Sequence, residues 1–96
     1  MMAYASEDTN LIEISISGDP GTRFSATFEI HQGNEIITSK IEEMVPSTHR
    51  YHGEILEARV RQESEQGGLT VEIRKSGNVS RSSTRGMSSE MKLRVR

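Results

Sequence analysis

Apolar and polar residues alternate in five short blocks between Leu11 and Val95. Successive side chains on a β-strand point to opposite faces, so a strand with this alternation has one buried face and one solvated face. All of the alternating apolar positions except Ala26, Ala58 and Met91 form the predicted core. The alternating positions are Ile12, Ile14 and Ile16; Phe24, Ala26, Phe28 and Ile30; Leu56, Ala58 and Val60; Leu69, Val71 and Ile73; and Met91, Leu93 and Val95.

Turn-forming sequences separate these blocks. Residues 18–21 read Gly-Asp-Pro-Gly, in which Pro presets its own φ angle and Gly accepts a positive one. Gln-Gly-Asn at 32–34 and Lys-Ser-Gly-Asn at 75–78 are typical of turns between paired strands, and 63–68 reads as a loop that ends in two glycines. We therefore expect strands at about 11–17, 23–30, 35–41, 52–62, 69–74 and 91–95.

Several stretches are ambiguous. Residues 42–51 read as an irregular connection, in which Pro46 fits a strand end or a crossing between sheets. Residues 79–90 are rich in Ser and Thr and predict either a poor edge strand followed by a loop or a loop throughout. Residues 54–62 contain good helix formers, but their period-two pattern favours a strand. The adjacent Ile36 and Ile37 leave open which face of their strand is buried.

The number and spacing of the strands indicate the fold class. Short strands at roughly ten-residue spacing are typical of an antiparallel sandwich or a small barrel. The chain has 96 residues, of which 32% are apolar and 4% aromatic, enough for one modest core in a thin two-layer domain. We predict an all-β, immunoglobulin-like β-sandwich of about seven short strands at 11–96, preceded by a flexible segment at 1–10.

The formal charge of −2 hides an uneven distribution, since residues 1–48 carry a net −6 and residues 49–96 a net +4. One interpretation is that strand order mixes the two halves and leaves a patchwork surface. The other is a dipolar surface that meets an anionic partner through its C-terminal half. The predicted contact residues for that partner are Arg74, Lys75, Arg81 and Arg85. The last third of the chain, which contains these four residues, has no aromatic residue and no predicted helix, so we do not expect nucleic acid as the partner.

The sequence contains none of the motifs that would indicate catalysis or a cofactor. It has no Cys, which excludes disulfides and thiolate chemistry, and no nucleophile elbow or phosphate-binding glycine loop. His49 and His52 lie three residues apart, but Arg50 between them disfavours a metal ion. We therefore expect no enzyme activity, no cofactor and no metal, and no apolar run is long enough to span a membrane.

Several short motifs resemble the soluble domain of the MmpS-type proteins, a family of small mycobacterial membrane proteins. They are IEISISGDPGTRFSATFEI with Gly18, Gly21 and Phe28, then Val45-Pro46-Ser47, then Leu69, Val71, Ile73 and Gly77 with the Ser/Thr-rich stretch that follows. The resemblance implies a small β-sandwich outside the cytoplasm, tethered by a leading membrane helix, that assists a lipid or siderophore exporter. The chain has neither that helix nor the family's Cys pair, so no functional residue is transferred from the family.

The function that these observations favour is a non-catalytic binding or accessory module. We expect an exported bacterial domain, periplasmic or extracellular, whose partner is a membrane transporter or an envelope protein. The alternative is a structural or assembly protein that oligomerises or pairs through an edge strand, for which 79–85 is the outermost candidate. A small enzyme or carrier with a pocket between the sheets is a third hypothesis. The sequence leaves the oligomeric state open.

Overall fold

The computed structural model describes residues 10–87 and 89–96. They form eight strands and, within the described residues, no helix. The strands are β1 (Leu11–Gly18), β2 (Arg23–Gln32), β3 (Glu35–Met44), β4 (Ser47–His52), β5 (Ile55–Gln62), β6 (Gly68–Lys75), β7 (Asn78–Arg85) and β8 (Glu90–Val95). The all-β prediction is therefore confirmed. The predicted flexible segment 1–10 lies, apart from Asn10, outside the described residues.

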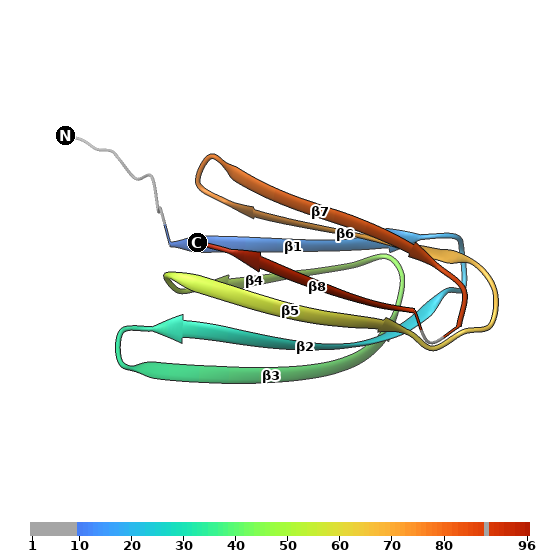
Figure 1. Ribbon diagram of the computed structural model, residues 1–96, viewed down its shortest axis with the longest axis horizontal. Coiled ribbons are helices and arrows are strands. Elements are labelled where there is room, and N and C mark those ends of the chain that lie inside the picture. Colours follow the sequence, from blue (N-terminus) through green and yellow to red (C-terminus); the bar gives the residue numbers. More distant parts are fainter. Residues whose placement is uncertain (1–9, 88) are drawn as a thin grey trace.

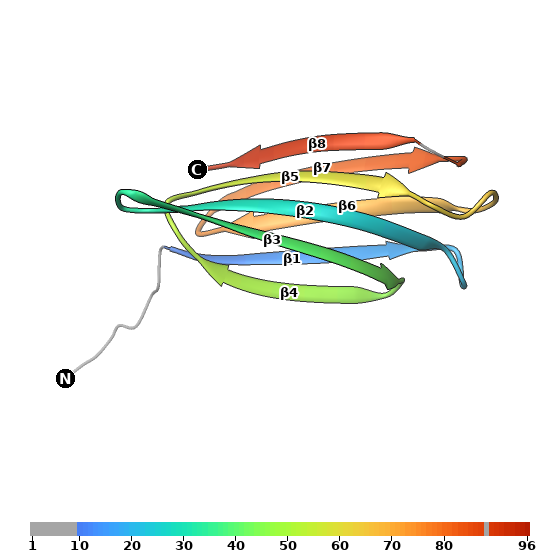
Figure 2. The ribbon, with the colours of Figure 1, turned by 90° about the horizontal axis from the view of Figure 1, so that it is seen from below.

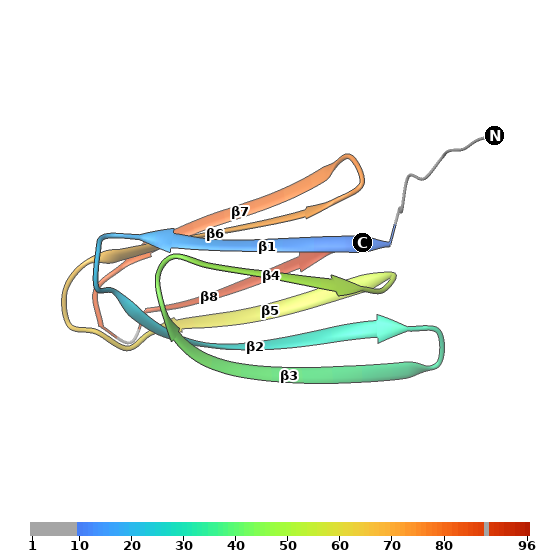
Figure 3. The same cartoon turned by 180° about the vertical axis from the view of Figure 1, so that it is seen from behind.

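The strands build two antiparallel four-stranded sheets that pack into a β-sandwich. One sheet has the order β4-β1-β6-β7 and the other β3-β2-β5-β8. The molecule is elongated, with β7 along the upper margin and β3 along the lower margin of Figure 1. In Figure 2, β7 and β8 lie together at one side and β3 approaches β4 at the other, while Figure 3 places β1 and β4 nearest the viewer.

The core fills the space between the sheets, as the alternation predicted. Every large apolar residue in the predicted core is buried, and Phe28, Leu56 and Val71 are fully so. Ala26, Ala58, Met91 and Val45 complete the cluster. Residues that are paired across neighbouring strands point to the same face of the sheet. The alternating apolar positions of each strand were therefore enough to identify the core.

The structure corrects the prediction for residues 42–51. They are not an irregular connection, because β3 pairs with β2 as far as Met44 opposite Arg23, and 47–52 form β4 beside β1. The inward positions of β4 are polar, so this strand shows no apolar alternation. The strand predicted at 52–62 begins later, at Ile55, because His52 ends β4 and residues 53–54 connect the two sheets. A Cβ atom on Gly53 would lie 2.5 Å from Ile30 Cγ2, so this connection needs glycine. The result is eight strands instead of about seven.

The other ambiguous stretches are settled as well. Residues 78–85 form β7, an edge strand paired with β6, so 79–90 is a strand followed by a short connection. Residues 55–62 form a strand, and both Ile36 and Ile37 are exposed. The immunoglobulin-like part of the prediction is not confirmed. In immunoglobulin constant domains the first two strands share a sheet, whereas β1 and β2 lie in different sheets here.

Candidate functional site

The four basic residues predicted as partner contacts do not form one patch. Arg74, Arg81 and Arg85 occupy outward positions on β6 and β7, since they alternate with the inward residues of these strands. Lys75 points to the inner face and is buried, next to the β6–β7 turn. Arg85 lies opposite Gly68 at the other end of the same hairpin. Three of the four therefore share a face, and Lys75 lies away from it.

Carboxylates largely offset the charge of these arginines. Arg74 Nε donates to Glu72 Oε2 at 2.8 Å, and Arg81 lies opposite the same Glu72 in the strand register. Arg85 Nη1 lies 3.7 Å from Asp19 Oδ2. Exposed pairs of this kind contribute little stability, but each places an acid where an anionic partner would have to bind.

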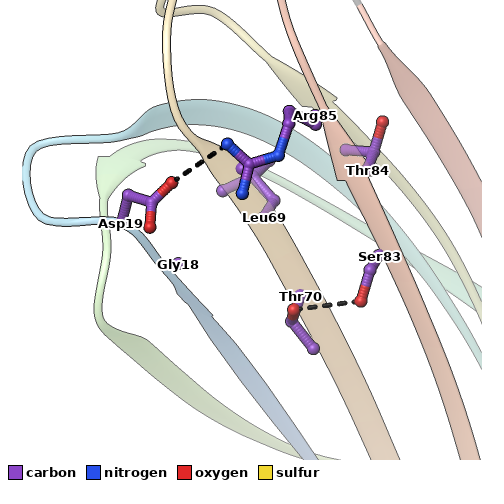
Figure 4. A pocket seen from close by; sticks show the side chains of 8 residues that line it. Gly18, Asp19, Leu69, Thr70, Ser83, Thr84 and Arg85 are labelled. Atoms are coloured by element: carbon purple, nitrogen blue, oxygen red, sulfur yellow. Dashed lines mark hydrogen bonds and ion pairs between the residues drawn. The ribbon is translucent and has the colours of Figure 1, made fainter.

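A shallow, open depression lies beside Arg85, at the end of the sheet where β1 and β6 approach closely (Figure 4). Its volume is about 430 Å³, and its lining includes Gly18, Gly68, Thr70 and Ser83. A Cβ on Gly18 would lie 2.1 Å from the Gly68 carbonyl oxygen, so the two backbones need glycine here. Thr70 and Ser83 bond to each other, so their hydroxyls are already engaged.

A second set of cations crosses the outer face of the other sheet. The register pairs Lys40 with Thr27, Thr27 with Arg59, and Arg59 with Lys92. Paired residues lie on the same face, and each of these four alternates with buried or half-buried neighbours, so all four side chains point outward. We call Lys40, Arg59 and Lys92 the cation row. It runs from edge strand β3 to edge strand β8.

Unlike Arg74 and Arg85 on the other sheet, the members of the cation row have no acidic partner among the described residues. Salt bridges engage Arg61 and Arg94 nearby, but none engages Lys40, Arg59 or Lys92. Like charges directly opposite each other on neighbouring strands are destabilising, and Arg59 faces Lys92 in this way. The row therefore holds positive charge that an anionic ligand could neutralise.

Sequence reasoning missed the cation row because its members come from three strands far apart in the chain. Arg59 and Lys92 each have an arginine two residues away, but no stretch of the sequence brings Lys40, Arg59 and Lys92 together. Only the β2–β3, β2–β5 and β5–β8 registers bring them into line. The same mixing of strands from both halves of the chain favours the patchwork surface over the dipolar one.

A polar cluster joins β3 to β4 at the open side of the sandwich. Ser47 Oγ donates to Glu43 Oε1, and His49 Nε2 lies 2.7 Å from Ser47 Oγ and 3.1 Å from Glu43 Oε1. Nearby, the hydroxyls of Ser39 and Tyr51 lie 3.1 Å apart. The cluster links the edge strands of the two sheets where neither pairs with the other.

This cluster has the residue types of a hydrolytic triad but not its geometry. In a triad the acid holds one imidazole nitrogen and the nucleophile bonds to the other. Here both Glu43 and Ser47 contact the same nitrogen, Nε2 of His49. The hydrogen bond from Ser47, together with the charge of His49, lowers the pKa of Glu43 below its ordinary value of 4.5, against a smaller opposing effect of desolvation. The arrangement fits a carboxylate-centred link between strands.

The histidines lie on strands and not in loops. His31 is on β2, 3.8 Å from Glu57, while His49 and His52 are on β4 with opposite orientations. No group of three or more His, Asp or Glu side chains in the described ranges converges on a point where a metal ion could bind. The described part of the chain also contains no helix with the length and hydropathy that a membrane span requires.

Comparison with protein-family models, with curated proteins and with solved structures finds no match for this chain. The resemblance to the MmpS-type domain therefore stays a prediction, and the function has to be argued from the surface of the sandwich.

Proposed function

We propose that this protein is a non-catalytic binding module that docks an acidic segment of a protein partner on the cation row. The partner we expect is a membrane transporter or envelope component, and the domain would act outside the cytoplasm of a bacterium. The observation that carries the proposal is the line of three cations, Lys40, Arg59 and Lys92, without an acidic partner among the described residues.

The spacing of the row supports an extended acidic peptide. Neighbouring strands lie about 4.8 Å apart, so three strand spacings from β3 to β8 cover roughly 14 Å. An extended segment of about five residues has that length, so carboxylates near its two ends would meet Lys40 and Lys92. Thr27, between Lys40 and Arg59, is uncharged and adds a hydroxyl to the same line.

The two faces of the sandwich offer a matched comparison. The test measures binding of a fluorescently labelled oligoglutamate peptide by anisotropy at low and at physiological ionic strength, with oligoglutamine as the neutral reference. We expect the double variant Arg59→Gln/Lys92→Gln to weaken oligoglutamate binding at least tenfold. The double variant Arg74→Gln/Arg81→Gln removes the same charge from the other face and should bind as the wild type does.

The same variants then serve as baits on separated membrane and soluble fractions. A transporter or envelope protein that binds the wild type and the Arg74→Gln/Arg81→Gln bait, but not the Arg59→Gln/Lys92→Gln bait, would be the expected partner. Equal oligoglutamate binding by all three proteins would refute the proposal. Loss confined to the Arg74→Gln/Arg81→Gln variant would move the site to the other sheet, and preference for anionic vesicles over the peptide would make the ligand a lipid surface.

A further inference from the structure

Edge strand β3 exposes an unusual amount of apolar surface. Of the five large hydrophobic side chains that are exposed among the described residues, three lie on β3, namely Ile36 at 60%, Ile37 at 44% and Met44 at 54%. The others are Val79 and Met87. β3 is also a ten-residue strand, and no described strand lies beyond it at the lower margin of Figure 1. Long, exposed, apolar edges are the ones that pair with another chain.

The edge strand predicted from sequence, β7, is better protected against pairing. It carries Arg81 and Arg85 on its outer face, and β8 lies beside it at the same margin of the sandwich (Figure 2). β3 has an uncharged run from Ile36 to Ser39. Charged side chains and a covering strand are the usual means by which an edge avoids association, and this part of β3 has neither.

We propose that β3 pairs antiparallel with β3 of a second copy of this chain, about a two-fold axis at Ile41, to form one continuous eight-stranded sheet. A two-fold axis perpendicular to the sheet keeps the outer faces of both copies on the same side. Residues that are paired across the axis must then point to the same face, and side chains alternate between faces along a strand. The axis therefore passes beside one residue, which faces the same residue of the second copy. Each possible axis then fixes which charges meet across the interface.

The charges on β3 select the axis at Ile41. An axis at Ser39 would place Glu43 opposite Glu35 of the second copy, and an axis at Lys40 would place that residue opposite itself. With the axis at Ile41, Lys40 faces Glu42 of the second copy, and this pair occurs twice by symmetry. An axis at Ile37 or at Thr38 creates no pair of opposite charges. The Ile41 axis also brings Met44 opposite Thr38 and so covers one exposed apolar side chain, while Ile36 and Ile37 lie beyond the paired segment 38–44.

The surface around the proposed axis has room for the partner strand's side chains. An open depression of about 500 Å³ is lined by Ser25 and Thr27 of β2 with Lys40, Ile41 and Glu42 of β3. Neither Lys40 nor Glu42 has an ion pair within the described residues, so both are available to a second copy. In the dimer Lys40 pairs with Glu42 of the second copy, so each copy keeps Arg59 and Lys92 of its cation row on one continuous face. The function proposed above does not depend on the dimer, since Arg59 and Lys92 lie away from the interface.

Charge reversal with rescue tests the pairing. Sedimentation equilibrium of the wild type should show a monomer–dimer equilibrium, and Lys40→Glu or Glu42→Lys should weaken the dimer at least tenfold. The double variant Lys40→Glu/Glu42→Lys restores opposite charges across the axis and should bring the dissociation constant back to within about threefold of the wild type. Arg81→Glu reverses a charge on β7, an edge strand of the other sheet, and should leave the dimer unchanged. Melting curves establish that every variant is folded.

Cross-linking tests the axis itself. The chain has no Cys, so Ile41→Cys introduces a single thiol. Residues that face each other across antiparallel strands have Cα atoms about 4.5–5.5 Å apart, within the range of a disulfide. We expect Ile41→Cys to oxidise to a covalent dimer faster than Ile37→Cys or Val79→Cys. A wild type that stays monomeric at the highest soluble concentration, oligomers that grow beyond dimers, no rescue by the double variant, or faster cross-linking at 37 or 79 would each overturn the proposal.

Discussion

Phe28 offers the strongest single test of the core. Its side chain is fully buried, and its ring centroid lies 5.6 Å from that of Tyr51 and 6.0 Å from that of His49. Replacement of a buried Phe by Ala costs about 3–5 kcal/mol, from lost burial and the cavity that remains. One side of Phe28 borders the open edge between β3 and β4, where Tyr51 can move into part of the space. We therefore expect Phe28→Ala to lower the free energy of unfolding by about 3–4 kcal/mol.

That loss is a large part of the total stability, which for a domain of this size is about 5–14 kcal/mol. Urea unfolding followed by circular dichroism measures it directly, and the melting midpoint should fall by about 15–25 °C. Phe28→Leu keeps most of the volume and should cost less than half as much. Thr27→Ala changes the neighbouring outward position and should cost about 0.5 kcal/mol or less. A loss below about 1 kcal/mol in Phe28→Ala would refute the assignment of Phe28 to a well-packed core.

Three further predictions concern polar groups and a turn. Gln62 is fully buried, and its Nε2 donates to the carbonyl oxygens of residues 64, 66 and 67. Gln62→Ala should therefore lower the free energy of unfolding, measured with urea, by about 1–3 kcal/mol. The control Glu65→Ala, in the same loop, should leave it almost unchanged. Because the pKa of Glu43 is lowered on folding, this group stabilises the protein above its ordinary pKa of 4.5, and the contribution is lost as the pH falls through the folded-state value. Urea midpoints of Glu43→Gln should therefore depend less on pH in the acid range than those of the wild type, and an identical dependence would contradict the role of its hydrogen bond to Ser47. Ser76 has a left-handed φ of 55° in the β6–β7 turn, so Ser76→Gly should raise the free energy of unfolding by about 0.5–1 kcal/mol and the melting midpoint with it. A lower midpoint would contradict this account of the turn.

The parts of the fold that were predictable are those in which inward side chains are apolar. Ile12, Ile14 and Ile16 on β1 show the period of a half-buried strand directly, and so do the inward residues of β6. In strands of this kind the alternation predicts both the strand and its buried face. The turn at 18–21 was equally predictable, because its position requires a positive φ and Gly21 adopts one, 86°.

The parts that were not predictable have polar side chains at inward positions. β4 turns Ser47, His49 and Tyr51 inward at the margin of the sandwich, where hydrogen bonds replace apolar contacts, so its sequence resembles a loop. The inward positions of β7 are Ser and Thr as well. The candidate site was missed for a different reason, because the cation row exists only through the registers of three pairs of strands. Sequence reasoning instead favoured basic residues that are close in the chain, and the fold sends Lys75 to the opposite face from Arg74.

The order of strands in the two sheets has a consequence for the way the chain folds. Of the six strand pairings, only β2–β3 and β6–β7 join strands that are consecutive in the chain. Hairpins of this kind form within about 1–10 μs, whereas folds dominated by distant pairings take milliseconds to seconds. β1 lies between β4 and β6, both much later in the chain, so it can be placed in its sheet only after these strands exist. We therefore expect two early hairpins, one from each sheet, and a slow step in which β1 docks between its distant neighbours and encloses the core.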